Sequence, residues 1–116
     1  MFNFFKKRPT SGEALKGWLD AIKNRDEEQF AKFCQKTWLG RNAVSISQWS
    51  RLDIIDYVIL SSREISRVMH SYKVSIRGRK GVSKVQLIVI KERRPYRASR
   101  LFGRWGVNPT SWRLLK

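Results

Sequence analysis

The chain has 116 residues, enough for one domain with a real buried core. Its 25 Lys and Arg residues outnumber 9 Asp and Glu residues, so the formal net charge is +16. An apolar content of 41% argues against disorder, and a single cysteine excludes an internal disulfide. No apolar stretch approaches the roughly 18 residues of a membrane span. The composition therefore predicts a small, soluble and strongly basic domain.

The positive charge is concentrated in the second half of the chain. The formal charge is +3 over residues 1–12, zero over 13–62, +6 over 63–90 and +7 over 91–116. Self-repulsion of this size destabilises a compact chain, which favours an anionic partner such as nucleic acid, an acidic protein surface or a lipid headgroup layer. The alternative is a surface that serves only solubility.

Residues 1–9 form an arm in which aromatic residues precede a basic run. Lys6, Lys7 and Arg8 are candidate contacts to the anionic partner, and the arm either docks on a neighbour or frays. The apolar part is too short for a secretory signal and its charge lies on the wrong side. We therefore expect a cytoplasmic protein, or one within a particle assembled in the cytoplasm, with a single domain over residues 10–116.

Two capping patterns mark helix starts, each with Thr or Asp followed three residues later by Glu or Gln. These are Thr10 with Glu13 and Asp26 with Gln29. Apolar residues at helical spacing follow each, which predicts helices over 11–23 and 27–37. Ser47 can cap a third, short helix.

From about residue 57 the apolar spacing changes to two, which is typical of strands. The predicted strands cover residues 57–60, 68–76, 82–90 and 111–115. We expect a long basic loop over 91–106. The predicted fold class is α+β, with an N-terminal helical hairpin and a short helix packed on a curved antiparallel sheet.

The sequence offers little that is typical of catalysis. His70 is the only histidine, and its alternation with apolar residues predicts a core histidine, with a general base as the alternative. Cys34 lies on the apolar face of the second helix and is expected to be a buried thiol. Phosphate-binding glycine loops, nucleophile elbows and two-histidine motifs are absent from the sequence. We therefore expect no enzyme, no metal and no cofactor.

Two segments are candidate anion-binding sites. Residues 78–81, with Arg79 and Lys80 between two glycines, resemble the GXXG loop of KH domains. That loop joins two helices, however, whereas strand-like residues flank it here, so a hairpin is the simpler interpretation.

The basic loop is the strongest candidate, because arginine forks suit phosphates or carboxylates and aromatic rings stack on bases. Its candidate residues are Arg93, Arg94, Tyr96, Arg97, Arg100, Phe102, Arg104 and Trp105. The alternative is a solvated loop whose aromatic residues fold back on the core.

The layout resembles the nuclear transport factor 2-like (cystatin-like) superfamily. The resemblance covers residues 11–116 and rests on the following residues: Leu15, Trp18, Leu19 and Ile22, then Asp26 and Phe30, for the opening hairpin, and 72–76, 85–89 and 111–114 for the last three strands. It implies a curved sheet wrapped round the helices. Enzymatic members of that superfamily use an acid or histidine deep in the cone, while many other members are non-catalytic assembly or binding modules.

Three functions follow as hypotheses. The first is a non-enzymatic structural or assembly module that docks through its basic surface onto an anionic partner in a larger complex, such as a viral particle or a mobile-element assembly. The second is a free nucleic-acid-binding protein. The third is a cone-shaped domain that binds a small molecule or acts as an isomerase, with His70 and Tyr72 lining its cavity.

Overall fold

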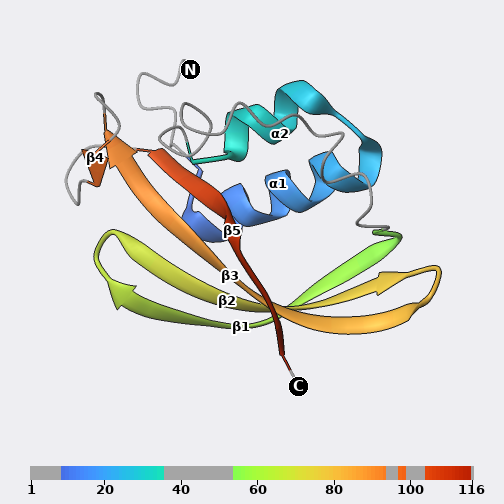
Figure 1. The fold of residues 1–116 in the computed structure, drawn as a ribbon. Helices are drawn as coiled ribbons and strands as arrows, with labels where there is room; N and C mark the ends of the chain where they lie inside the picture. The colour runs from blue at the N-terminus through green and yellow to red at the C-terminus, as the bar shows by residue number, and fades with distance from the viewer. Residues whose placement is uncertain (1–8, 36–53, 94–96, 99–103, 116) are drawn as a thin grey trace, which may run out of the picture.

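The computed structural model describes residues 9–35, 54–93, 97–98 and 104–115. Two helices lie on one side of an open antiparallel sheet that bends around them (Figure 1). The elements are α1 (Ser11–Asn24), α2 (Glu27–Phe33), β1 (Asp56–Ser66), β2 (Met69–Gly78), β3 (Gly81–Arg93), β4 (Arg97–Ala98) and β5 (Arg104–Leu115). The predicted α+β class is confirmed. Residues 1–8 of the predicted arm and the predicted third helix lie outside the described residues.

Both helices begin where the capping patterns predict. The Thr10 hydroxyl accepts a hydrogen bond from the Glu13 backbone N–H at 3.2 Å, and the Glu13 carboxylate accepts one from the Thr10 N–H at 3.1 Å. The Asp26 carboxylate likewise accepts from the Gln29 N–H at 3.0 Å. Helix α1 ends at Asn24, and its C-cap residue Arg25 has a left-handed backbone (φ 55°) that turns the chain into α2.

Helix α2 ends at Phe33, so the predicted extension to residue 37 is wrong. At this point the chain joins the edge of the sheet. Cys34 has extended backbone angles and forms an isolated parallel bridge with Val107. The Gln35 N–H then donates to the Val107 carbonyl at 2.8 Å. The backbone here hydrogen-bonds to the sheet instead of forming another helical turn. Helical periodicity in the sequence does not indicate this change of partner.

The strands pair in the order β1-β2-β3-β4, and β5 also pairs with β3. A tight turn joins β2 to β3, with Gly78 opposite Gly81. Gly81 has φ 130°, a conformation that glycine tolerates best, whereas Gly78 does not have a positive φ. The segment over 78–81 is therefore a β-hairpin and differs from a KH loop.

One core joins the helices to the sheet, as predicted. Its members include Trp18, Leu19, Phe30, Val74 and Leu87, all buried, with Trp112 packed against them. The Trp18 ring lies 5.5 Å from the ring of Phe30 and 6.4 Å from that of Trp112. Aromatic rings from both helices and from β5 thus close the space between the two layers.

The predicted basic loop over 91–106 is too long at both ends. Strand β3 continues to Arg93 and β5 already begins at Arg104. The reason is that Val107 is fully buried opposite Val89, which extends the β3–β5 pairing up to Glu92 and Arg104. Residues 97–98 form β4, a further partner of β3.

Strand β5 contains a large bulge that the sequence pattern does not indicate. Gln86 pairs with Arg113 and Ile88 with Asn108, so Leu87 faces the four residues 109–112. The Ser111 hydroxyl accepts a hydrogen bond from the Ile88 N–H at 2.8 Å and donates to the Asn108 carbonyl at 2.5 Å. A side chain thereby replaces a backbone partner inside the ladder.

Candidate functional site: the open face of the sheet

The sheet has one face under the helices and one open face, and the alternation along β2 defines both. Tyr72, Val74 and Ile76 are buried on the helix side. Lys73 and Arg77 alternate with them and are exposed on the opposite side. We call this second side the open face.

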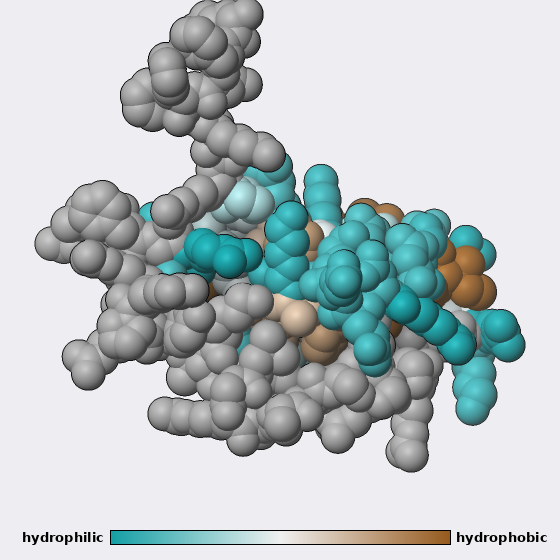
Figure 2. Space-filling view, turned by 90° about the horizontal axis from the view of Figure 1, so that it is seen from above, coloured by the Kyte–Doolittle hydropathy of each residue, from teal (hydrophilic) through white to brown (hydrophobic). Residues whose placement is uncertain are grey.

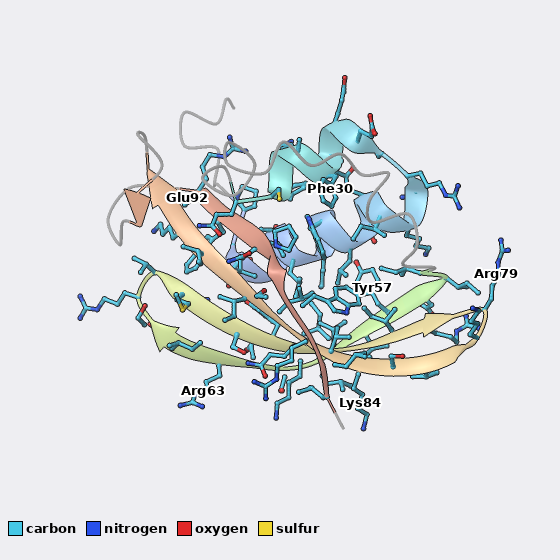
Figure 3. The ribbon with its side chains drawn as sticks, viewed as in Figure 1. Phe30, Tyr57, Arg63, Arg79, Lys84 and Glu92 are labelled. Atoms are coloured by element: carbon cyan, nitrogen blue, oxygen red, sulfur yellow. The ribbon has the colours of Figure 1, made fainter. Side chains whose placement is uncertain are left out.

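Cross-strand register places five exposed cationic residues on the open face. Arg63 pairs with Ser71, Lys84 with Ser75, and Arg113 with Gln86. Figure 3 shows Arg63 and Lys84 directed away from the helices. The open-face cations are Arg63, Lys73, Arg77, Lys84 and Arg113.

These cations are spread along the sheet instead of gathered at one point. Arg63 lies in the row of Ser71, while Lys73 and Arg113 share the next row through Gln86. Lys84 and then Arg77 follow in the next two rows of β2, and successive rows are about 6.7 Å apart at the usual strand rise. Each of four successive rows therefore holds at least one cation, which suits a repeating anion better than a single small one.

The open face keeps most of its charge uncompensated. Among the described residues its one exposed acid is Asp56, whose carboxylate lies 3.6 Å from the Arg77 guanidinium. Both side chains are more than half exposed, so this pair contributes little to stability. Glu92 alternates onto the same side at the end of β3 but is buried. Five exposed cations against one exposed acid leave a formal excess of four positive charges.

The helix layer has a different charge balance. Its residues 11–33 carry five acids and four bases, and seen from above (Figure 2) hydrophilic side chains cover much of the described surface. The described part of the molecule is therefore polarised, with the positive excess on the sheet side. An anionic partner approaching this part is attracted to the open face.

The chemistry of the open face is that of oxygen-anion binding. Lysine and arginine donors stand beside serine hydroxyls and the Gln86 amide, which itself donates to the Ser71 hydroxyl at 2.9 Å. The described rows carry no aromatic side chain on this face, so nothing there stacks on a base. Such a surface recognises phosphate or carboxylate groups without reading a base sequence.

The structure separates the predicted site residues that it describes. Arg79 and Lys80 form the exposed turn of the β2–β3 hairpin, and Figure 3 shows Arg79 at its tip. Arg104 lies opposite Glu92 in β5, and its guanidinium donates to the Lys32 carbonyl at 3.2 Å. Arg93 and Arg97 are paired strand residues of β3 and β4.

Trp105 lies on the helix side of the sheet, half-buried, and not on the open face. Its ring is 4.4 Å from that of His70, and the Lys91 ammonium lies 5.9 Å from its centroid. This matches the alternative in which an aromatic residue of the basic segment folds back on the domain. Lys6, Lys7, Arg8, Arg94, Tyr96, Arg100 and Phe102 lie outside the described residues.

The open face was missed at the sequence level because the search was for many cations in consecutive positions, and the open-face cations are far apart in the sequence. Lys73 and Arg77 alternate with buried residues, and Lys84 and Arg113 occupy the corresponding positions of the neighbouring strands. The period-two pattern was the available signal for Lys73 and Arg77. Nothing in the sequence alone places Arg63 and Arg113 on the same face, because bulges shift the register of both β1 and β5.

His70 belongs to a small polar cluster under the N-terminus of α1. The Ser11 hydroxyl lies 2.7 Å from His70 Nδ1 and 2.5 Å from the Tyr72 hydroxyl. Ser11 is buried, so these bonds attach the first turn of α1 to β2. The cluster brings together the two residues that the small-molecule hypothesis requires, yet their polar atoms hydrogen-bond to Ser11.

No model of a known protein family matches this chain, and neither does any curated protein sequence. Within the described residues, no three His, Cys, Asp or Glu side chains are grouped so that they could hold a metal ion. The helices described are also too short or too polar to cross a membrane.

Proposed function

We propose that this chain is a non-enzymatic docking module that holds an anionic partner on the open face of its sheet, as part of a larger assembly. The observation that carries the proposal is the placement of five exposed cations from four strands on one face, where the described residues include a single exposed acid. The partner supplies the negative charge that offsets the self-repulsion of a +16 chain.

Free nucleic-acid binding is the second candidate function. The chain has a sequence pI of about 11.0 and a basic face, which together are typical of nucleic-acid-binding domains. Its phosphate contacts would give an affinity that falls steeply with salt and barely depends on base sequence. An acidic protein carries negative charge as a nucleic acid does, but its charges are not regularly spaced like the phosphates of a nucleic acid.

The test compares two variants that remove the same charge from different faces. Lys73→Gln with Lys84→Gln neutralises two open-face cations, and Lys16→Gln with Lys23→Gln neutralises two exposed cations of α1. Binding to a fluorescent single-stranded oligonucleotide and to polyglutamate is measured by anisotropy over a salt series. Each lost phosphate contact lowers the log–log salt slope by about 0.7 on a single strand, so we expect a decrease of about 1.4 for the open-face variant.

The control variant separates a local site from a general charge effect. We expect the α1 variant to change the salt slope by much less than the open-face variant. Equal changes in both variants would mean that the whole positive surface attracts anions, and the proposed site would be rejected. Size-exclusion chromatography with the 260/280 nm absorbance ratio then shows whether the purified chain carries nucleic acid or assembles with itself.

A further inference from the structure

Strand β1 forms an edge of the sheet. It covers eleven residues, Asp56–Ser66, and pairs with β2. Within the described part of the chain nothing pairs with its other edge. At the usual rise, this edge presents about 36 Å of backbone donors and acceptors.

The middle of β1 lacks two of the features that protect strand edges from pairing, although it contains a bulge. Residues 57–62 contain no charge and no proline, although both are common on protected edges. Val58 is 60% exposed and Leu60 is 49% exposed. Leu60 is also the extra residue where the register with β2 shifts. Such an uncharged, largely apolar stretch at a strand edge is typical of a site that accepts another strand.

Hydrogen bonds and packing hold β1 in place on its helix side. The Tyr57 hydroxyl donates to the Asp20 carboxylate of α1 at 2.8 Å, and Ile59 packs against the core. The edge is therefore a fixed template over residues 57–59. An arriving strand would not have to order this stretch, which lowers the entropic cost of pairing.

The neighbouring charges indicate what kind of strand fits. On the open face the β1 residues are Asp56, Val58, Ser61 and Arg63, and Asp56 is already offset by Arg77. A strand added to β1 places its own open-face side chains directly opposite Arg63 and about 10 Å from Lys73. A second copy would instead bring two basic open faces together, each with an excess of four charges.

We propose that the outer edge of β1, which no described residue pairs with, takes an extended acidic segment of the partner protein by strand addition. Backbone hydrogen bonds supply the affinity, an acidic side chain pairs with Arg63, and an uncharged one lies against Val58. The acidic character of the segment rests on the proposed function of the open face, whereas the strand pairing rests on β1 alone.

The probe is an eleven-residue fluorescent peptide of alternating glutamate and threonine, which places its acids on one side of a strand. Two protein variants test the position of binding. Val58→Glu adds a negative charge to the β1 edge, and Val82→Glu adds the same charge to an equally exposed valine of β3 on the same face. We expect Val58→Glu to weaken peptide binding about tenfold or more, and Val82→Glu to weaken it less than about threefold.

Backbone pairing is tested by a peptide of identical sequence with N-methylated amides and by amide hydrogen exchange. We expect the methylated peptide not to bind, and the unmethylated one to slow exchange along β1. Equal binding of both peptides, or equal loss in both valine variants, overturns the strand addition. The proposed function of the open face is still supported in that case if the Lys73 and Lys84 substitutions weaken polyglutamate binding.

Two further outcomes also overturn the proposal. If a neutral peptide of alternating glutamine and threonine protects β1 equally well, the partner segment is not selected for acidity. If sedimentation shows a dimer that Val58→Glu dissociates, the occupant of the edge is a second copy. If polyglutamate binds the Lys73→Gln, Lys84→Gln variant as tightly as the wild type, by contrast, the result contradicts the function of the open face.

Discussion

Tyr57 shows how one side chain links β1 to the helix layer. Its hydroxyl donates to the Asp20 carboxylate at 2.8 Å and lies 3.2 Å from the Lys16 carbonyl. Burial raises the pKa of Tyr57 above its ordinary value of 10.0, and the hydrogen bond to Asp20 and the charges of Asp20 and Asp56 raise it further. The phenol therefore keeps its proton where an unfolded tyrosine would lose it.

This shift predicts a stability change at alkaline pH. The folded state holds its proton more tightly than the unfolded state, so the contribution is complete below pH 10 and is lost progressively above it. We expect Tyr57→Phe to be less stable than the wild type at neutral pH and this difference to shrink above pH 10. Urea unfolding of both proteins at several pH values measures the difference, and a constant gap would contradict the assignment.

His70 contacts Ser11 and holds the start of α1 on the sheet, and the proposed function gives it no role in proton transfer. We expect His70→Gln to bind polyglutamate or oligonucleotide as the wild type does, because His70 lies on the helix side of the sheet and away from the open face. Glutamine retains a side-chain group that can hydrogen-bond to Ser11. Loss of binding in a variant whose circular dichroism spectrum is unchanged would contradict the placement of the binding site on the open face and would indicate a site on the helix side.

At the scale of elements, the bulge in β5 decides how the sheet meets the helices. Four residues of β5 face Leu87, and the last of them, Trp112, contacts Trp18 of α1. Ser111 supplies the hydrogen bonds that the interrupted ladder lacks. One hydroxyl thus supports both the pairing of β5 and the position of a core aromatic residue.

Replacing Ser111 should therefore cost more than replacing an exposed serine. Ser111→Ala leaves the half-buried Ile88 N–H without its acceptor, and we expect a loss of about 1–3 kcal/mol in the free energy of unfolding. Ser61→Ala, on exposed β1, should change it by less than about 0.5 kcal/mol. Chemical denaturation gives both values. Equal values for the two variants would show that the bulge does not depend on this hydroxyl.

At the scale of the whole molecule, the distribution of charge dominates. The chain carries +16, and the described open face holds an excess of four of these charges beside a nearly neutral helix layer. Repulsion among exposed cations is screened by salt over about 10 Å at 0.1 M ionic strength. Binding of a polyanion removes the same repulsion and also stabilises the folded state by mass action.

We therefore expect the thermal unfolding midpoint to rise with salt and with added polyglutamate. Lys73→Gln with Lys84→Gln should reduce the shift caused by polyglutamate, whereas Lys16→Gln with Lys23→Gln should largely retain it. Differential scanning fluorimetry over a series of salt and polyanion concentrations measures both effects. A midpoint that falls with salt would contradict the view that self-repulsion limits the stability of this domain.

The local features of the fold could be predicted from the sequence because their causes are local. The cap residues Thr10 and Asp26 satisfy backbone N–H groups within three positions, and helical or alternating spacing reveals the buried side of each element. These rules identified both helix starts, the strand character of 68–76 and 82–90, and the shared core of helices and sheet. The net charge likewise followed from counting.

Tertiary structure alone decided where α2 ends, how long β1 and β5 are, and which cations lie on the same face of the sheet. The helix ends before Cys34 because Cys34 forms a parallel β-bridge with Val107, which lies 73 positions later in the chain. Arg63 and Arg113 join Lys73 on the open face only through strand register, which the bulges in β1 and β5 shift. Register depends on pairing between distant segments, and a shift of one residue exchanges the two faces. For this reason charge density along the chain pointed to the segment over 93–105, while the pairing of strands assembled the basic face.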